Sequence, residues 1–278
     1  MFISFVCDER DGNGNEFFGK LAFTSDRDGN SEIYVYDFIK KSTSRITSNT
    51  ITDELPSWSP DGRFIVYRSY DTMRNADLYI ADIRTLYIRR LTSFEGEECN
   101  PKWSPDGKWI VFERVTGNNV DLYLTDSAGK HNIQLTNSLA NELNCSWSPD
   151  SRKIAFVSSE DGDYEIYVMD TKGTILSKLT DNATWDKFPS WSPDGKHIAF
   201  VSGRDNGRDI FIMKSDGSNV KKICSGTMPC WTPDNKFLGI QMNINRNSEI
   251  VLIDTSGKQI MNITNHPAND YFPAFSNK

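Results

Sequence analysis

Residues 191–200 read Trp-Ser-Pro-Asp-Gly-Lys-His-Ile-Ala-Phe, and the same phrase returns with small changes along the chain. The other copies begin at Trp58, Trp103, Trp147 and Trp231, so successive spacings are 45, 44, 44 and 40 residues. A sixth equivalent position, 44 residues further on, is Phe275. A period in the low forties is typical of the four-stranded blades of β-propellers.

Each repeat predicts four strands. The first ends at the tryptophan, and Ser-Pro-Asp-Gly then suits a type I turn, because proline presets φ and glycine closes the turn. The second strand is Ile198–Ser202 in the quoted repeat. The third opens with an acid, as at Glu165, and the fourth ends in Leu-Thr or Ile-Thr, as at Thr180. Strands that are apolar on both faces require a sheet on each side.

The two ends of the chain each supply part of one blade. Residues 270–276 have the pattern of a first strand with no second, and residues 19–23 that of a second strand with no first. We therefore predict that the C-terminal strand completes the N-terminal blade, which removes exposed sheet edges. The expected fold is all-β, a six-bladed propeller of four-stranded antiparallel blades over residues 17–278. Residues 1–16 are an N-terminal extension, interpreted as a vestigial blade fragment.

Composition narrows the possible partners. The chain has 278 residues, a formal net charge of −7 and no basic run, which disfavours nucleic acid as a partner. No segment is apolar enough for a membrane span, and we expect a monomer. Five cysteines without a CxxC motif indicate neither a disulfide framework nor a zinc site; we expect Cys224 and Cys230 to remain unpaired.

The Trp-Ser-Pro-Asp-Gly turns, the Ile-Ala-Phe strands and the Glu165–Asp170 strand (EIYVMD) resemble the TolB-type, WD40-like propeller repeat, PD40. The resemblance covers residues from about 17 to 278. It implies a six-bladed propeller that binds partner proteins at the bacterial cell envelope, in the periplasm or outside the cell. No signal peptide is visible in this chain.

A search for catalytic chemistry finds none of the familiar motifs. GxSxG, HExxH, GxxxxGK[ST] and GxGxxG are all absent. The three histidines, His131, His197 and His266, occupy different positions in their repeats, so they cannot form a ring around a channel metal. We therefore assign no catalytic residue, no metal ligand and no cofactor.

A carboxylate precedes the repeated aromatic residue by five positions in five of the six blades. These candidate residues at the channel mouth are Asp53, Glu98, Glu142, Asp186 and Asp270, and Gly226 stands in the remaining blade. Gathered around one opening, they would attract a cation, a Lys or Arg side chain, or a peptide amino terminus. The alternative is that each acid caps the backbone amides of the adjacent loop, once per blade.

Several rules of the repeat fail together near the boundary of the fifth and sixth repeats. Lys214 stands where aspartate is usual, Cys224 where threonine is usual and Asn235 where the turn glycine is usual. Broken symmetry indicates either sequence drift or a surface for a partner.

These observations favour a non-catalytic propeller that binds a protein or peptide and resembles the TolB C-terminal domain. Two alternatives stay open. The chain could be a hydrolase or lyase assisted by carboxylate-bound Ca²⁺ or Mg²⁺, or the propeller part of a larger peptidase or surface protein.

Overall fold

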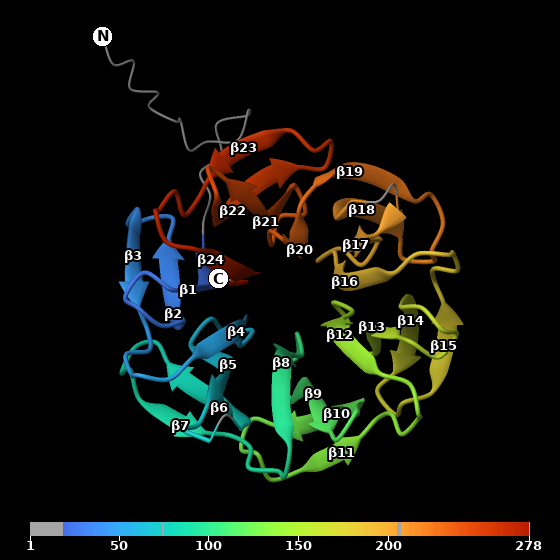
Figure 1. Ribbon diagram of the computed structural model, residues 1–278, viewed down its shortest axis with the longest axis horizontal. Coiled ribbons are helices and arrows are strands. Elements are labelled where there is room, and N and C mark those ends of the chain that lie inside the picture. Colours follow the sequence, from blue (N-terminus) through green and yellow to red (C-terminus); the bar gives the residue numbers. More distant parts are fainter. Residues whose placement is uncertain (1–18, 74, 205–206, 278) are drawn as a thin grey trace.

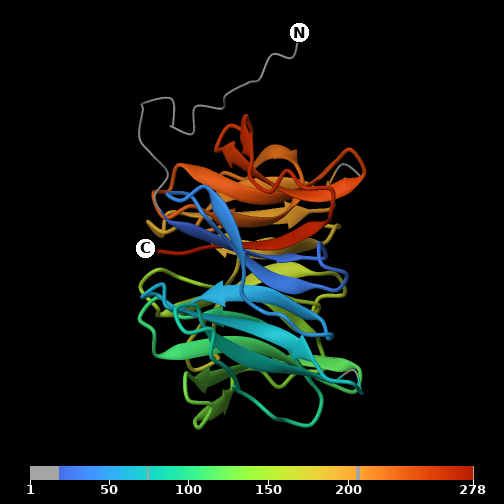
Figure 2. The ribbon, with the colours of Figure 1, turned by 90° about the vertical axis from the view of Figure 1, so that its left-hand side faces the viewer.

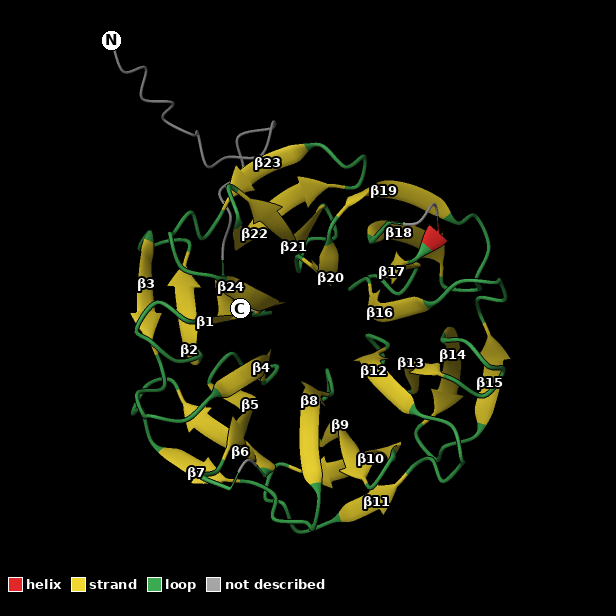
Figure 3. Ribbon diagram, viewed as in Figure 1, coloured by secondary structure: helices red, strands yellow, loops and turns green. Residues whose placement is uncertain are grey.

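The computed structural model describes residues 19–73, 75–204 and 207–277. Their strands form six four-stranded antiparallel sheets arranged as blades around a central axis (Figure 1). Figure 3 shows that strands and their connecting loops make up nearly all of the ring. The six-bladed, all-β fold predicted from the repeat is confirmed. The extension predicted for residues 1–16 lies outside the described residues.

The first three blades contain the N-terminal half of the described chain. Blade one is β24 (Asp270–Phe275), β1 (Lys20–Ser25), β2 (Glu32–Asp37) and β3 (Ser42–Arg45). Blade two is β4 (Asp53–Trp58), β5 (Phe64–Tyr70), β6 (Ala76–Asp82) and β7 (Ile88–Arg90). Blade three is β8 (Glu97–Trp103), β9 (Trp109–Thr116), β10 (Asn119–Asp126) and β11 (Asn132–Gln134).

The other three blades follow in the same order. Blade four is β12 (Glu142–Trp147), β13 (Lys153–Ser158), β14 (Glu165–Asp170) and β15 (Ile175–Lys178). Blade five is β16 (Asp186–Trp191), β17 (His197–Ser202), β18 (Asp209–Lys214) and β19 (Lys221–Ser225). Blade six is β20 (Thr227–Trp231), β21 (Phe237–Ile244), β22 (Asn247–Asp254) and β23 (Gln259–Asn262).

The repeated turn joins the first two strands of a blade as predicted. In blade two the N–H of Gly62 donates to the carbonyl of Ser59 at 2.9 Å, and Gly62 has φ +68°. Glycine reaches this left-handed region without steric cost. The carboxylate of Asp61 accepts from the Ser59 hydroxyl at 2.6 Å and from the Arg63 N–H at 3.1 Å, which fixes the turn from inside.

Apolar residues on both faces of each blade pack against the neighbouring blades. One cluster joins Ile33 and Val35 of blade one to Trp58, Ile65 and Tyr67 of blade two. Figure 2, which shows the ring edge-on, makes the stacking of successive blades visible. The core is therefore divided into interblade layers, as expected for strands that are apolar on both faces.

The ring closes where the sequence predicts. Strand β24 pairs antiparallel with β1, with Leu21 opposite Phe275, and the C-terminal strand lies innermost in the N-terminal blade (Figure 1). The indole N–H of Trp58 donates to the carbonyl of Ala274 at 3.0 Å. The C-terminal strand is thus bound both to its own blade and to the next.

One boundary of the predicted strands is wrong. The fourth strands end before the repeated threonine; β3, for example, ends at Arg45, ahead of Thr47. The reason is that the Thr47 hydroxyl accepts a hydrogen bond from the backbone N–H of Ile33 at 2.9 Å. A side chain has taken the place of a backbone ladder partner. The same bond recurs in four other blades, through Thr92, Thr136, Thr180 and Thr264.

Candidate functional site: the central channel

The six innermost strands surround a central cavity of about 300 Å³. All six contribute a lining residue from the same register position, two residues after the position of the predicted acid. These residues are Leu55, Asn100, Asn144, Phe188, Met228 and Phe272. Equivalent positions therefore converge on one space.

Each of these six residues has left-handed backbone geometry, with φ between +48° and +59°. Each lies where the pairing of the first and second strands shifts register, as in a β-bulge. A non-glycine residue in this region costs roughly 1–2 kcal/mol. Proline follows in five blades, and it has no N–H to continue the ladder. The bulge interrupts the strand and places one side chain per blade against the cavity.

The cavity has an apolar arc and a polar arc. Phe188, Met228, Phe272 and Leu55 come from four consecutive blades: five, six, one and two. Blades three and four place amide side chains, Asn100 and Asn144, at the same position. A guest in the channel would therefore meet hydrophobic contacts on one side and hydrogen-bonding groups on the other.

A buried carboxylate lies at the centre of the polar arc. Glu113 of β9 is 7% exposed and accepts from the Asn100 side chain at 2.5 Å and from the Asn144 backbone N–H at 2.7 Å. Burial raises the pKa of Glu113, and the Lys102 charge acts against that rise. Lys102 also lines the cavity and has no ion pair within the described residues. The nearby Arg68, by contrast, is paired with Glu54.

The five acids predicted from the sequence lie at equivalent places at the start of the inner strands. All are buried: four are 0% exposed and Glu142 is 4% exposed. None is among the residues that line the cavity. Each has one buried carboxylate oxygen without a hydrogen-bond partner within the described residues: Asp53 Oδ1, Glu98 Oε1, Glu142 Oε2, Asp186 Oδ1 and Asp270 Oδ2.

The other carboxylate oxygen of each acid has a partner nearby. The Asn49 side chain donates to Asp53 at 2.7 Å, the Thr92 hydroxyl to Glu98 at 2.9 Å, and the Ser138 hydroxyl to Glu142 at 2.6 Å. These contacts agree with local capping by side chains of the preceding loop. The second oxygen of each carboxylate has no hydrogen-bond partner within the described residues, but it is buried.

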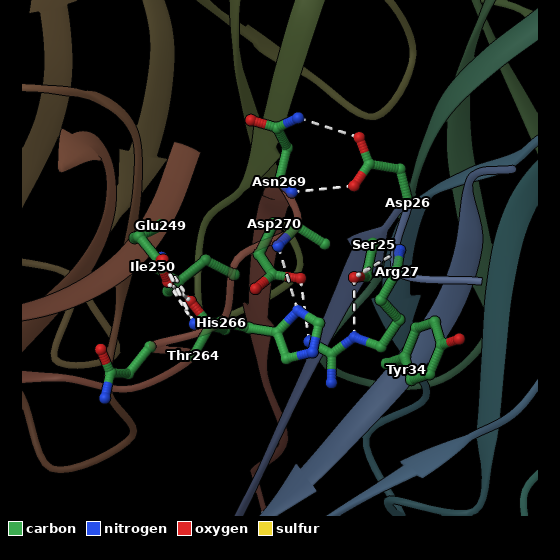
Figure 4. Close-up of polar contacts among 12 residues, drawn as sticks. Ser25, Asp26, Arg27, Tyr34, Glu249, Ile250, Thr264, His266, Asn269 and Asp270 are labelled. Atoms are coloured by element: carbon green, nitrogen blue, oxygen red, sulfur yellow. Dashed lines mark hydrogen bonds and ion pairs between the residues drawn. The ribbon is translucent and has the colours of Figure 1, made fainter. Parts of the chain in front are cut away.

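Two of the five acids are neutralised by an arginine. Arg204 contacts Asp186 at 2.8 Å, and Arg27 contacts Asp270 at 3.0 Å. Figure 4 shows the Arg27 side chain directed at Asp270. The remaining three, Asp53, Glu98 and Glu142, come from consecutive blades and have no ion pair in the described parts of the chain. We call these three residues the unpaired acid arc.

Burial raises the pKa of every member of the unpaired acid arc. The pKa of Asp53 rises to about 6, chiefly because its carboxylate is desolvated. That of Glu98 rises to about 8, through burial and the proximity of Asp77, and that of Glu142 is raised by burial. Each of these carboxyl groups therefore keeps its proton to a higher pH than an exposed carboxyl does.

We predict that the stability of the protein falls as the pH rises, and that the Glu98→Gln substitution makes this fall smaller. Because the folded-state pKa of Glu98 is above its usual 4.5, its contribution is fully present below about pH 4.5 and is lost as the pH rises towards about 8. The expected fall in Tm across this window is several degrees, because a difference of one pKa unit is about 1.4 kcal/mol and 1 kcal/mol shifts the Tm of a large domain by about 2–4 °C.

The measurement is thermal unfolding from about pH 5 to about pH 8. The wild-type Tm is expected to fall across this window, and the Tm of the Glu98→Gln variant to fall less. Glu97→Gln, a change at the neighbouring, partly exposed position, should leave the wild-type slope unaltered. Parallel slopes for the wild type and Glu98→Gln would contradict the prediction.

The acids that open the third strands have structural contacts, as expected from their presence in every blade. Glu32 accepts from the backbone N–H of Asn49 at 2.8 Å, in the loop that leads to the next blade. It also pairs with Arg45 at 3.0 Å. Arg45 belongs to the fourth strand of the same blade.

Sequence reasoning missed three features of the channel. The left-handed residues gave no propensity signal. Lys102 stands where every other blade has a small residue, and Glu113 stands at a position that varies from blade to blade. The only signal for Glu113 was the contrast with Val157 and Val201 in the next two blades, because the other three blades have polar residues at this position.

Metal binding finds no support in the described residues, which hold no cluster of three or more His, Cys, Asp or Glu side chains suited to an ion. The nearest polar contact of His131 is Asp126, on its own turn. Cys224 and Cys230 are free thiols. Over the same residues, no helix has the length and apolar character needed to cross a membrane.

Six four-stranded blades, a central channel and closure by the C-terminal strand define a six-bladed β-propeller. A family profile described as the TolB beta propeller domain, PD40, matches residues 56–163 and 145–228, together more than half of the chain. The chain therefore belongs to the TolB β-propeller family.

Individual proteins agree with this assignment. The chain is 36% identical over 69 residues to the Tol-Pal system protein TolB of Desulfosudis oleivorans, in a match covering 25% of this chain and 16% of that protein. The structure of TolB from Acinetobacter baumannii has a TM-score of 0.84 at 22% identity and covers 93% of this chain and 66% of its own. Oligogalacturonate lyase from Vibrio parahaemolyticus, at 14% identity and a TM-score of 0.56, covers 88% of each chain and shares the fold.

The chain thus spans 16% of the TolB of Desulfosudis oleivorans and 66% of the TolB of Acinetobacter baumannii, less than two thirds of either. The structural likenesses, all at low identity, establish a propeller scaffold. What the scaffold binds has to be argued from its own residues.

Proposed function

We propose that this protein is a non-catalytic binding propeller that holds a protein or peptide segment at its channel. A cationic side chain or an amino terminus of that segment would lie at the channel mouth, where the negative charge of the unpaired acid arc attracts it through space. The observation that carries the proposal is that three buried carboxylates in consecutive blades form no ion pair within the described residues, and each has an oxygen without a hydrogen-bond partner there.

Electrostatics favours a cationic guest. An ionised carboxylate buried without a partner is costly, and its raised pKa expresses that cost. A bound ammonium or guanidinium at the channel mouth would supply countercharge at short range, although the carboxylates themselves are buried. Asp186 and Asp270 already have arginine partners, so they would contribute less and the guest would lie towards blades two to four.

The cavity supplies the rest of the contact. The apolar arc of Phe188, Met228, Phe272 and Leu55 offers surface for hydrophobic side chains. Asn100 and Asn144 offer hydrogen bonds to a peptide backbone. Membership of the TolB family supports a protein partner, since a relative is named as part of the Tol-Pal system, and it supports a place at the bacterial cell envelope.

The test uses a synthetic library of short peptides, prepared once with free amino termini and once N-acetylated. Wild-type protein is expected to enrich peptides with a free amino terminus or with Lys and Arg. The variant Asp53→Asn, Glu98→Gln, Glu142→Gln should retain these peptides at least about tenfold more weakly, because it removes the charge of the acid arc.

The matched control removes three carboxylates from exposed loops: Glu95→Gln, Glu160→Gln and Asp181→Asn. It changes the net charge by the same amount and should bind as the wild type does. Thermal unfolding of all variants verifies that they are folded. Equal capture by the acid-arc variant and the wild type, or enrichment of acidic peptides, would exclude the proposed role of these carboxylates.

A further inference from the structure

A second cavity, of about 430 Å³, lies between blades five and six, away from the channel. It is bounded by His197 of β17, Lys214 of β18, the hairpin that carries Asn219 and Lys221, and Trp231 of β20. We call it the interblade pocket. Its volume is in the range of small-molecule sites.

The pocket contains a cross-strand pair found in no other blade. His197 lies directly opposite Lys214 in the pairing of β17 with β18. At the same register position the other five blades have an aspartate: Asp37, Asp82, Asp126, Asp170 and Asp254. Two basic residues directly opposite each other lack the electrostatic attraction that stabilises an acid–base pair across two strands. Blade five therefore presents basic groups where its neighbours present a carboxylate.

The aspartate that Lys214 replaces has a structural task in the other blades. In blade six, Asp254 Oδ1 accepts the backbone N–H groups of Ser256 at 2.8 Å and Lys258 at 3.0 Å, and so fixes the turn after the third strand. In blade five, Asp216 Oδ1 accepts from the N–H of Ser218 at 2.9 Å instead. The capping carboxylate has moved two residues along the chain, so the turn is kept while position 214 carries a lysine.

The lysines of the pocket form no ion pair in the part of the chain that the structure describes, although Lys214 lies within electrostatic reach of Asp216 in the adjacent turn. Within the described residues, neither Lys214 nor Lys221 forms an ion pair. The one carboxylate that borders the pocket, Asp194, contacts Lys196 at 3.5 Å and accepts from the Ser192 hydroxyl at 2.7 Å. The pocket therefore presents two lysines outside ion pairs, on a protein whose net charge is −7.

Flat rings and amide donors complete the pocket. The centroids of the His197 and Trp231 rings lie 6.5 Å apart, and the angle between the ring planes is 31°. The Trp231 N–H is bound to the Ser190 carbonyl at 3.1 Å, so the indole meets the pocket with carbon surface. Asn235 accepts the Asp194 N–H through its side-chain oxygen at 2.7 Å, which leaves its amide hydrogens available as donors.

We propose that the interblade pocket binds a small anionic ligand, a phosphate or carboxylate carried on a sugar or aromatic ring. The anion lies between Lys214 and Lys221, and the ring lies against His197 and Trp231. Charge-assisted hydrogen bonds supply the strong contacts, and the rings supply apolar surface. This site is independent of the channel and of its proposed peptide guest.

Titration calorimetry tests the proposal with adenosine monophosphate, glucose 6-phosphate and glucuronate as ring-bearing anions. Adenosine and glucose are the uncharged counterparts, and inorganic phosphate is the anion without a ring. At least one ring-bearing anion should bind at millimolar concentration or below, more tightly than phosphate and its uncharged counterpart. Comparison of the three identifies the source of the anion. Absence of binding by all three, or equal binding of phosphate, overturns the proposal.

The decisive variant is Lys214→Asp, which restores the residue that the other five blades use and should fold normally. It is expected to weaken binding at least about tenfold, since an attractive charge becomes a repulsive one. Lys172→Asp, the same charge change at an exposed turn residue of blade four, should alter binding less than about twofold. Unchanged affinity in Lys214→Asp overturns the proposal even if an anion binds elsewhere.

Discussion

A chain that ends at Asn269 is expected to lose cooperative folding. The truncation removes β24, the innermost strand of blade one, and leaves the edge of β1 without its partner. It also removes the carbonyl acceptor of the Trp58 indole at Ala274 and leaves Arg27 without Asp270. Free energies of unfolding of natural domains are about 5–15 kcal/mol, and the loss of a whole strand and its two interfaces is of that order.

The measurements are the fraction of soluble protein, the near-ultraviolet circular dichroism and the thermal transition. The truncated chain should show no sharp transition, and its exposed strand edge should promote aggregation. The matched control removes only residues 277–278, which follow β24, and should unfold as the full chain does. A cooperative transition within a few degrees of wild type in the truncated chain would contradict the role of ring closure.

Restoring the strand separately strengthens the test. A synthetic peptide of residues 268–278, added in excess, should bind the truncated chain and recover part of the thermal transition, because β-strand addition satisfies the free edge. A peptide in which Pro273 and Ala274 are both replaced by aspartate should not, since Pro273 is buried and Ala274 packs in the layer between blades one and two.

The fold was predictable because its determinants are local and repeated. The Trp-Ser-Pro-Asp-Gly turn specifies its own geometry through Ser59, Asp61 and Gly62. Its regular spacing then gives the number of blades, and the incomplete patterns at residues 19–23 and 270–276 give the closure. The end of the fourth strands was misplaced because the Thr47 side chain replaces a backbone partner, a substitution that a hydrophobic pattern cannot reveal.

The candidate site was predictable only in part. The period identified five equivalent acids, but it carried no information on their depth, and all five proved to be buried. Their division into paired and unpaired members depends on Arg27 and Arg204, which lie two residues beyond the buried serines Ser25 and Ser202. The lining residues were missed because Leu55 and Phe188 do not favour left-handed geometry in isolation.

Arg27→Ala is expected to destabilise the protein by about 3–5 kcal/mol, the range for leaving a buried charge without its partner. Asp270 is 0% exposed, and Arg27 is its only ion-pair partner within the described residues. Arg27 also donates to the Ser25 hydroxyl at 2.8 Å, and its guanidinium lies 4.6 Å from the centre of the Tyr34 ring. Figure 4 shows these contacts at the junction of β1 and β24.

A double-mutant cycle separates the charge from the packing. Asp270→Asn removes the carboxylate charge, so the variant carrying both changes should be more stable than Arg27→Ala alone, despite its additional substitution. If the cost of Arg27→Ala came from lost packing against Tyr34 alone, the second change would bring no recovery. Urea unfolding of the four proteins measures the free energies directly.

The pH dependence of the Arg27→Ala penalty provides a second, independent test. Burial raises the pKa of Asp270 and Arg27 opposes that rise, so without Arg27 the folded-state pKa moves further up. Stability from a raised carboxyl pKa is lost as the pH rises; the penalty of Arg27→Ala should therefore be larger at about pH 8 than at about pH 5.

Arg63→Ala, which breaks the partly exposed pair with Asp82 at 2.7 Å, should cost much less and depend little on pH in this window, because water screens that pair. An equal penalty for Arg27→Ala at both pH values would mean that Asp270 does not depend on Arg27 for its charge.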